Sequence, residues 1–195
     1  GSTRRGRFAP YLPIDHPDIR EFLNIGTEGD EIQELTHGVT VTNEWMESMI
    51  AGDEEKRAIW ALVLERRSQI GYPYIFFTDT VNNNTVDVYK DRGDKITHSN
   101  LCSEIMLPNN EEWSFVCNLS SMNLLHYDEW KDTDAVETLT YFLDAVMTDF
   151  ITKLEALRDG DEDDKQSFYF MERAYNFAVE NRALGLGVNN CALTQ

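Results

Sequence analysis

Apolar residues recur along this chain with two different spacings, and their alternation predicts short strands interspersed with longer helices. Val39 and Val41 alternate with polar residues, as expected for a strand with one buried face. Thr42 or Asn43 can cap the helix that follows, and Gly52 can end it in a left-handed conformation. The pattern therefore predicts a strand followed directly by a helix in this region.

Three further stretches of the first half continue the same alternation. Residues 8–23, FAPYLPIDHPDIREFL, predict a strand that enters a turn, with Pro17 at the first position of a helix. A helix with apolar residues at helical spacing is expected between a cap at Asp53 and a stop at Gly71. Residues 72–77, YPYIFF, form a continuous apolar and aromatic run that is typical of a buried strand.

The second half contains the most regular helical pattern. Residues 132–157 carry one apolar stripe at helical spacing, made of Val136, Leu139, Leu143, Val146, Phe150 and Leu154. A last helix over 166–184 leads into the segment GLGV. The polar, asparagine-rich residues 80–94 predict a loop or an irregular hairpin. Because strands alternate with helices along the chain, the sequence indicates an α/β fold.

The charge and the cysteine content restrict the function. The 195 residues include 35 acids and 17 bases, which gives a formal net charge of -18 at pH 7. Such a surface repels phosphate backbones, so nonspecific binding to nucleic acid or to anionic membranes is not expected. Three cysteines are too few for a disulfide scaffold and favour a reducing, cytoplasmic compartment. No apolar run approaches the ~18 residues that a membrane helix needs.

The stretch SNLCSEIMLPNN, residues 99–110, spaces Asn100, Cys102 and Glu104 two residues apart. In an extended segment these three side chains would project to the same side. An amide, a thiol and a carboxylate on one side can act together on a single ligand. A free cysteine is nevertheless more often a small buried apolar residue, so the short pattern alone leaves both interpretations open.

The longer sequence around this motif favours the functional interpretation over that of a buried structural cysteine. SNLCSEI, followed by PNNEEWSFVCNLSSMNL, closely resembles the active-site region of the catalytic (large) subunit of class I ribonucleotide reductase. RRGRFAPYLPIDHPDI, HGVTVTNEWM, GYPYIFF, YDEW and ENRALGLGV resemble that family in the same order, up to about Val188. The resemblance implies that residues 1–195 form a single partial catalytic barrel domain, part of a ten-stranded α/β barrel with a central finger loop.

The resemblance also implies a role for each residue of the motif. Cys102 matches the cysteine that becomes a thiyl radical and removes the 3′ hydrogen of the substrate ribose. Glu104 matches the carboxylate that handles the 3′-hydroxyl proton, and Asn100 matches the amide that hydrogen-bonds the sugar. Cys117 matches one of two cysteines that supply reducing equivalents and close into a disulfide. The second of these cysteines should precede Thr3 and is not in this sequence.

Two other positions carry information through the same resemblance. Arg4 or Arg5 falls where the family has the loop that links the allosteric specificity site to the substrate base. Leu101 stands where cobalamin-dependent members more often carry a proline, and it therefore favours class I. The four histidines show no metal-ligand spacing, so no metal site is expected in this chain.

The resemblance implies partners that lie outside this chain. A small metal-containing subunit would supply the radical, and thioredoxin or glutaredoxin would supply the reductant. A ribonucleoside diphosphate would be the substrate, ATP and deoxynucleoside triphosphates the effectors, and the complete large subunit would dimerise. Two alternatives stay open: a noncatalytic or split-enzyme piece that keeps the core for subunit or nucleotide binding, and an adenosylcobalamin-dependent reductase. Because complete catalytic subunits are much longer, the isolated chain is not expected to turn over.

Overall fold

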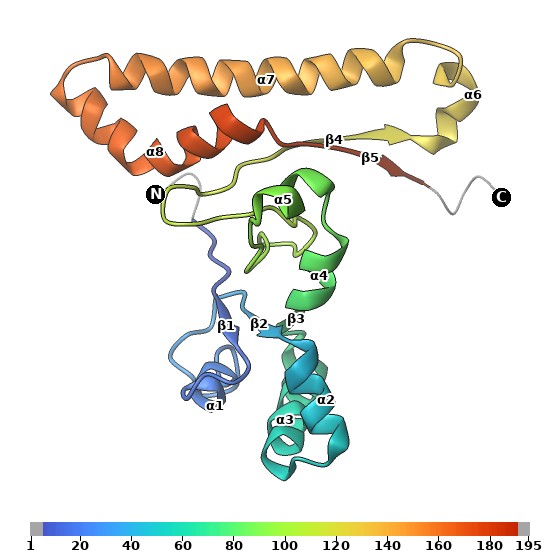
Figure 1. Ribbon diagram of the computed structural model, residues 1–195, viewed down its shortest axis with the longest axis vertical. Helices are drawn as coiled ribbons and strands as arrows, with labels where there is room; N and C mark the ends of the chain where they lie inside the picture. Colours follow the sequence, from blue (N-terminus) through green and yellow to red (C-terminus); the bar gives the residue numbers. More distant parts are fainter. Residues whose placement is uncertain (1–5, 191–195) are drawn as a thin grey trace. The chain divides into compact units, whose positions relative to one another are not determined.

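A computed structural model describes residues 6–190 of the chain. The chain divides into two compact units, Gly1–Pro108 and Asn109–Gln195. Each unit contains parallel strands joined through helices, which confirms the predicted α/β class (Figure 1). The expected grouping of both units in one barrel domain stays a prediction.

The first unit is built on a three-stranded parallel sheet in the order β1-β2-β3. Its elements are β1 (Tyr11–Pro13), α1 (Ile19–Phe22), β2 (Gly38–Val41), α2 (Asn43–Ala51), α3 (Glu54–Ile70), β3 (Tyr74–Phe77), α4 (Thr78–Asn84) and α5 (Asp87–Arg92). In the register, Tyr11 lies beside Gly38 and Val39 beside Ile75. The central strand β2 contributes the fully buried Val39 to the core.

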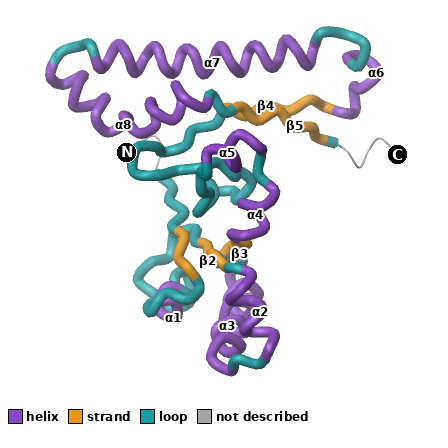
Figure 2. Tube along the Cα trace, in the orientation of Figure 1, coloured by secondary structure: helices purple, strands orange, loops and turns teal. Residues whose placement is uncertain are grey.

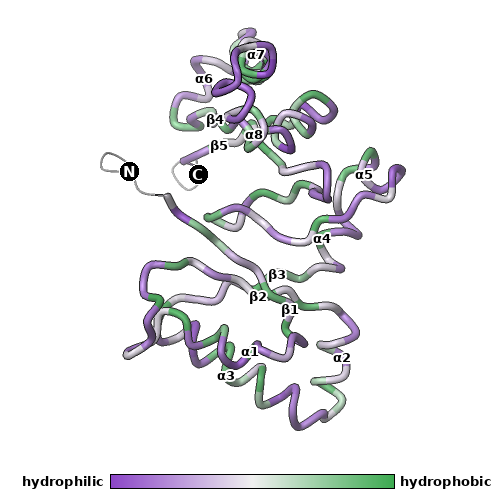
Figure 3. The backbone as a smooth tube through the Cα atoms, turned by 90° about the vertical axis from the view of Figure 1, so that its left-hand side faces the viewer, coloured by the Kyte–Doolittle hydropathy of each residue, from purple (hydrophilic) through white to green (hydrophobic). Residues whose placement is uncertain are grey.

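The helices of this unit begin and end largely where the local signals predict. Thr42 Oγ1 accepts a hydrogen bond from the Trp45 N–H and caps α2, which ends at Gly52 in the left-handed conformation. Asp53 caps α3 in the same way, and Gly71 ends it with φ 81°. By contrast, α1 begins two residues after Pro17, because Asp18 is the N-cap. Figure 3 shows hydrophilic and hydrophobic residues alternating along α3, as its sequence pattern requires.

The core of the first unit lies between the sheet and helices α1, α2 and α3. Its buried members are Ile14, Ile19, Leu23, Val39, Val41, Trp45, Ile59 and Val63. Trp45 and Trp60 meet with ring centroids 6.2 Å apart, so the two helices of the α2–α3 pair contact each other through aromatic side chains. This core holds β1 and β3 in register with β2, and the first residue of β1, Tyr11, contacts the segment that contains Cys102.

The prediction of a loop or hairpin over residues 80–94 is wrong, because the structure forms α4 and α5 there. Asn82 provides the physical reason. Its Nδ2 donates to the Thr78 and Ile96 carbonyls, both at 2.9 Å, and its Oδ1 accepts from the Ile96 N–H at 3.0 Å. The amide therefore pairs with the backbone of the fully buried Ile96, and this contact across 14 residues overrides the local preference for a turn.

The second unit pairs two parallel strands along the long helix α7, as Figure 2 shows by its strand and helix colours. Its elements are β4 (Asn118–Asn123), the 3-10 helix η1 (Leu124–His126), α6 (Tyr127–Trp130), α7 (Ala135–Arg158), α8 (Glu162–Asn181) and β5 (Leu184–Asn189). The GLGV segment is thus part of a strand that the sequence pattern does not predict. Each residue of β5 lies beside one of β4, from Leu184 opposite Asn118 to Asn189 opposite Asn123.

The long helix α7 confirms the strongest helical prediction, but its buried face is rotated from the predicted stripe. Leu143, Met147 and Leu154 are buried, whereas Val136 and Val146 are exposed. Helix α8 also begins earlier than predicted, inside the acidic run. Asp161 Oδ1 accepts hydrogen bonds from the N–H groups of residues 163 and 164, and acidic side chains in a first helical turn suit the helix dipole.

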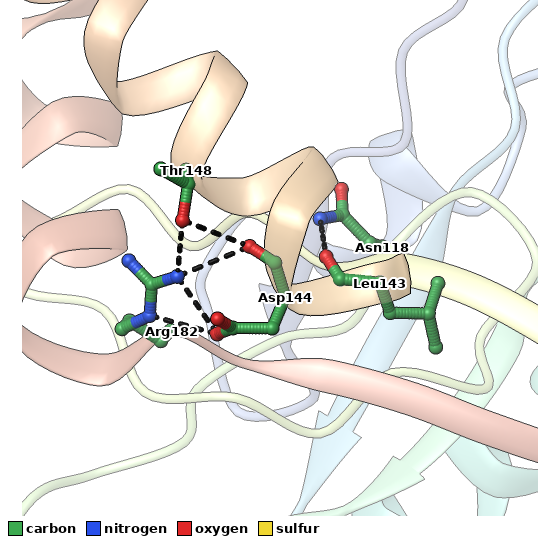
Figure 4. A network of polar contacts seen from close by, with 5 residues as sticks. All are labelled: Asn118, Leu143, Asp144, Thr148 and Arg182. Atoms are coloured by element: carbon green, nitrogen blue, oxygen red, sulfur yellow. Dashed lines mark hydrogen bonds and ion pairs between the residues drawn. The ribbon is translucent and has the colours of Figure 1, made fainter. Parts of the chain in front are cut away.

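A polar network ties the end of α8 to α7 (Figure 4). Arg182 caps α8 in the left-handed conformation, with φ 43°. Its guanidinium donates to Asp144 Oδ1 at 2.7 and 2.9 Å, to the Asp144 carbonyl at 3.0 Å and to Thr148 Oγ1 at 2.7 Å. Nearby, Asn118 Nδ2 donates to the Leu143 carbonyl at 3.2 Å. Together these bonds fix the strand pair against the middle of α7.

Over residues 6–190, no helix is long and apolar enough to cross a membrane. The same part of the chain contains no group of three or more His, Cys, Asp or Glu side chains that could hold a metal ion.

His37, just before β2, is fully buried. Its ring packs edge-on against Phe22 at a centroid distance of 5.2 Å and lies 5.9 Å from the ring of Tyr72. Within the described residues, neither ring nitrogen has a hydrogen-bond partner of normal geometry. Burial therefore lowers the pKa of His37, and the nearby Leu35 backbone opposes only part of this effect.

We expect the free energy of unfolding to fall as the pH drops below about 6.5, the ordinary pKa of histidine. The unfolded chain then binds a proton that the buried ring does not, so stability is full above this pH and is lost toward the lowered pKa. His37→Phe should reduce this pH dependence in urea unfolding between about pH 5 and pH 8. Burial also lowers the pKa of His98, so the part of the pH dependence that His98 contributes should remain in His37→Phe. The exposed His126→Asn is the control, and an unchanged slope in His37→Phe contradicts the assignment.

The Arg182 network yields a second expectation about stability. Arg182→Ala removes every guanidinium bond but keeps a Cβ in the left-handed conformation. We expect a loss of about 1 kcal/mol, since the bonds are charge-assisted but partly exposed. Arg182→Gly loses the same bonds yet relieves the backbone, so it should be the more stable variant. Urea unfolding of both variants measures the two effects, and equal stability of Arg182→Ala and the unchanged chain refutes the network's contribution.

Candidate active site

The segment that contains Cys102 is a turn, so the prediction of an extended segment is wrong. The Ser103 N–H donates to the Asn100 carbonyl at 3.1 Å, which closes a four-residue turn. Ser103 itself has φ 66°, in the left-handed region. Strand alternation therefore does not place Asn100, Cys102 and Glu104 on one side. They are brought together because they lie in or beside one tight turn.

The Asn100 side chain holds this turn from within. Its Oδ1 accepts hydrogen bonds from the Glu104 and Ile105 N–H groups, both at 3.1 Å. The buried Ser99 hydroxyl has one proton to share between the Ile105 carbonyl at 2.7 Å and Asn100 Oδ1 at 3.1 Å. The carbonyl oxygen of the Asn100 amide is therefore occupied by the loop, and Nδ2 is the group left to donate to a ligand.

Two contacts connect the turn to the rest of the first unit. The Tyr11 hydroxyl on β1 is hydrogen-bonded to Ser103 Oγ at 3.2 Å. On the N-terminal side, Asn82 of α4 fixes the backbone of Ile96. The turn is thus attached to the sheet on one side and to α4 on the other, while the Cys102 and Glu104 side chains remain exposed.

Two tyrosines near the turn are neutral at physiological pH. Burial raises the pKa of Tyr11, although its hydrogen bonds to Ser103 and Ser99 oppose the shift. Burial is also the main cause of the raised pKa of Tyr74, with a smaller contribution from Tyr72 and a further one from Cys102. Both phenols consequently keep their protons at neutral pH, and they can donate hydrogen bonds near the turn.

Cys117 lies in the second unit, immediately before β4. Its thiol donates a weak hydrogen bond to the Asn118 carbonyl at 3.6 Å. On the neighbouring strand, a Cβ at Gly185 would lie 3.6 Å from the Cys117 sulfur and would overlap the Leu119 side chain. The glycine therefore permits the close approach of β5 to this part of β4.

The segment before Cys117 is attached to α8. Trp113 packs against Phe177 with perpendicular rings 6.2 Å apart. The Arg173 guanidinium donates to the Asn110 and Trp113 carbonyls, and the Ser114 N–H donates to the Arg173 carbonyl at 3.0 Å. These contacts position residues 110–117 without any regular secondary structure.

The predicted site residues thus fall into three groups. Asn100, Cys102 and Glu104 share the turn of the first unit, and Cys117 belongs to the second unit. Arg4 and Arg5 lie outside the described residues. The sequence analysis did not predict that Tyr11 contacts the turn through Ser103, and the resemblance gives no indication of this contact.

Comparisons with known proteins identify the family to which this chain is similar. The family model described as "Ribonucleotide reductase, barrel domain" matches residues 1–56 and 52–194. The solved structure of the Actinobacillus ureae class Id ribonucleotide reductase alpha subunit is similar, with a TM-score of 0.83 and 51% identity. That similarity covers 94% of this chain and 33% of the Actinobacillus chain.

Two curated viral relatives show the same relation. A Frog virus 3 (isolate Goorha) protein, named as a ribonucleoside-diphosphate reductase large subunit, is 35% identical over 206 residues, which cover 96% of this chain and 35% of the relative. The ribonucleoside-diphosphate reductase large subunit of Invertebrate iridescent virus 3 is 25% identical over 262 residues, which cover 96% of this chain and 39% of the relative.

This chain therefore spans between a third and two fifths of the length of these proteins. The family model, in contrast, matches the chain almost from end to end. The chain belongs to the ribonucleotide reductase family, as part of the barrel domain of a class I large subunit.

Proposed function

We propose that this chain carries the hydrogen-abstracting turn and one reducing cysteine of a ribonucleoside-diphosphate reductase. The observation that carries the proposal is the turn at residues 100–105, in a chain of this family. It presents an exposed thiol and an exposed carboxylate from a backbone that Asn100 holds fixed. Such a fixed backbone is what a reaction limited by positioning requires.

In the proposed reaction, a thiyl radical at Cys102 takes the hydrogen atom from C3′ of the ribose. Glu104 accepts the proton of the 3′-hydroxyl, and the 2′-hydroxyl leaves as water after it is protonated. Two electrons come from Cys117 and a second cysteine, whose thiols close into a disulfide. The hydrogen atom then returns to C3′ and regenerates the radical at Cys102. The sum is one ribonucleotide and two thiols converted to one deoxyribonucleotide, one water and one disulfide.

Asn100 has a defined part in this scheme. Because its Oδ1 binds the loop N–H groups, it contacts the sugar as a donor, through Nδ2. The oxygen that accepts this hydrogen bond then belongs to the substrate. One side chain thus both shapes the turn and orients the ribose.

A thiyl radical must be kept from water and from stray donors. In the described residues Cys102 is exposed, and this chain spans less than half of the length of the relatives. We therefore assign the shielding of Cys102 to the rest of a complete subunit, with the turn as the finger loop at the centre of a ten-stranded barrel.

The proposed partners follow from class I chemistry. A small metal-containing subunit generates the radical, and thioredoxin or glutaredoxin reduces the disulfide. ATP and deoxynucleoside triphosphates act as allosteric effectors, in part through Arg4 or Arg5, in a dimer of complete large subunits in the cytoplasm. The similarity to a class Id alpha subunit supports this proposal over a cobalamin-dependent reductase.

We expect Cys102→Ser and Cys117→Ser to fail in different ways in the full-length subunit that contains this segment. A serine at position 102 cannot hold the radical, so reduction should fall below detection while nucleoside diphosphate binding stays within about twofold. A serine at position 117 leaves hydrogen abstraction possible but removes a reducing thiol. Rapid-quench assays with the radical subunit and a dithiol should then show no multiple turnover.

The same assays contain their own controls. Unimpaired multiple turnover in Cys117→Ser refutes its role as a reductant, and residual reduction in Cys102→Ser refutes the radical site. If the unsubstituted full-length subunit binds no nucleoside diphosphate, the result favours a noncatalytic module instead.

Asn100 permits a sharper test, since its two roles use different atoms. Asn100→Asp keeps an acceptor oxygen for the Glu104 and Ile105 N–H groups but removes the Nδ2 donor. We expect unchanged amide exchange in the turn and a kcat/KM lower by on the order of tenfold or more. Asn100→Ala removes both functions, so exchange should also accelerate. Equal activity of Asn100→Asp and the unsubstituted enzyme contradicts the donor role.

A further inference from the structure

We propose that Tyr11 is a positioning residue for Cys102, and that it acts through the hydrogen bond between its hydroxyl and Ser103 Oγ. The bond measures 3.2 Å and joins positions 92 residues apart in the sequence. It connects the central sheet of the first unit to the residue that follows the thiol directly. The inference rests on the proposed function for its catalytic consequence, but the tether itself can be tested without activity.

The need for a tether arises from the backbone of Ser103. Its φ of 66° lies in the left-handed region, which Asn, Asp and Gly adopt more readily than Ser. A residue persists there only where its surroundings determine its conformation. The Ser103 N–H bond to the Asn100 carbonyl acts on one side, and the Tyr11 hydroxyl acts on the side chain. Because Ser103 adjoins Cys102, a change in its backbone angles moves the thiol.

The Tyr11 ring is itself held in place by the sheet. Tyr11 lies beside Gly38 in the β1–β2 register. A Cβ at Gly38 would lie 2.7 Å from Tyr11 Cδ1, so only a glycine leaves room for the ring at this position. The edge of the Tyr11 ring meets Phe76 with centroids 6.0 Å apart, and His98 lies 6.3 Å away. The residues packed around the Tyr11 ring therefore fix its orientation, and they direct its hydroxyl toward Ser103.

The protonation state of the phenol suits this role. Burial raises the pKa of Tyr11, so the hydroxyl stays neutral at physiological pH and can donate or accept. A neutral tether adds no charge beside Cys102 and Glu104. Tyr11 thus fixes the turn without disturbing the acid–base chemistry of its neighbours.

The first experiment compares amide hydrogen exchange in the turn of the full chain. Tyr11→Phe removes the hydroxyl alone, and Ser103→Ala removes its partner. Each should accelerate exchange of the Glu104 and Ile105 amides roughly three- to tenfold, as expected for the loss of one hydrogen bond. The double variant should exchange no faster than Tyr11→Phe alone, because that variant has already lost the bond to Ser103 Oγ, together with the contact of the hydroxyl to Ser99. Additive effects, or no acceleration, overturn the proposal.

Two further variants separate the tether from general damage. Tyr74→Phe removes a phenol hydroxyl from β3, on the other edge of the sheet. This hydroxyl pairs with Tyr72 instead of with the turn, so the exchange of these amides should be unchanged. Gly38→Ala keeps the Tyr11 hydroxyl but displaces the ring, and should reproduce the Tyr11→Phe exchange pattern in the turn. A Gly38→Ala chain with normal exchange in the turn contradicts the proposed geometry.

The second experiment measures the catalytic consequence in the full-length subunit with its radical subunit. Tyr11→Phe should lower kcat on the order of tenfold and leave the KM for the ribonucleoside diphosphate within about twofold. Ser103→Gly accepts the left-handed backbone but lacks the hydroxyl, and it should lose kcat equally. A kcat that stays unchanged in Tyr11→Phe overturns the positioning role. If the unsubstituted full-length subunit reduces no ribonucleotide, the proposed function fails, while the exchange comparison still decides the tether.

Discussion

The left-handed backbone of Ser103 is the constraint on which the candidate site depends. For a residue with a Cβ, this conformation costs on the order of 1 kcal/mol, so the surroundings must supply at least as much. Asn100 Oδ1 binds the two N–H groups that follow Ser103, and Tyr11 binds its hydroxyl. The turn is thereby fixed by side chains, and the directions of the Cys102 and Glu104 side chains follow from it.

The fold was predictable from sequence wherever the signal was local. Thr42 and Asp53 cap helices, and Gly52 and Gly71 end them, because each acts on backbone groups within one helical turn. Helices α4 and α5 escaped prediction because Asn82 finds its partner in Ile96, 14 residues along the chain. Strand β5 was not predicted because its glycines have no preference for strands. Its extended conformation comes from pairing with β4.

The site was predictable in its residue identities but not in its geometry. Spacing alone suggested an extended segment, whereas the resemblance identified Cys102 and its neighbours without giving their conformation. Nothing in a serine indicates a positive φ, and one of the contacts that hold Ser103 comes from Tyr11, 92 residues earlier. On α7 the same limit applies: Met147 is buried in place of Val146, since packing against the strands and α8 sets the face.

Neutral amides recur where this chain must hold its chemically important segments. Asn82 fixes the approach to the turn, Asn100 fixes the turn itself, and Asn118 fixes the strand after Cys117 to α7. A side-chain amide can pair with backbone groups as another peptide group would, because it offers both a hydrogen-bond donor and an acceptor. A charged anchor would do the same mechanical work, but it would also shift the pKa of a nearby thiol or carboxylate. Near Cys102 and Glu104 the amides of Asn82 and Asn100 are neutral, so they set the positions of the reactive groups without shifting their protonation. The segment before Cys117 is held differently, because the charged Arg173 guanidinium binds its carbonyl groups.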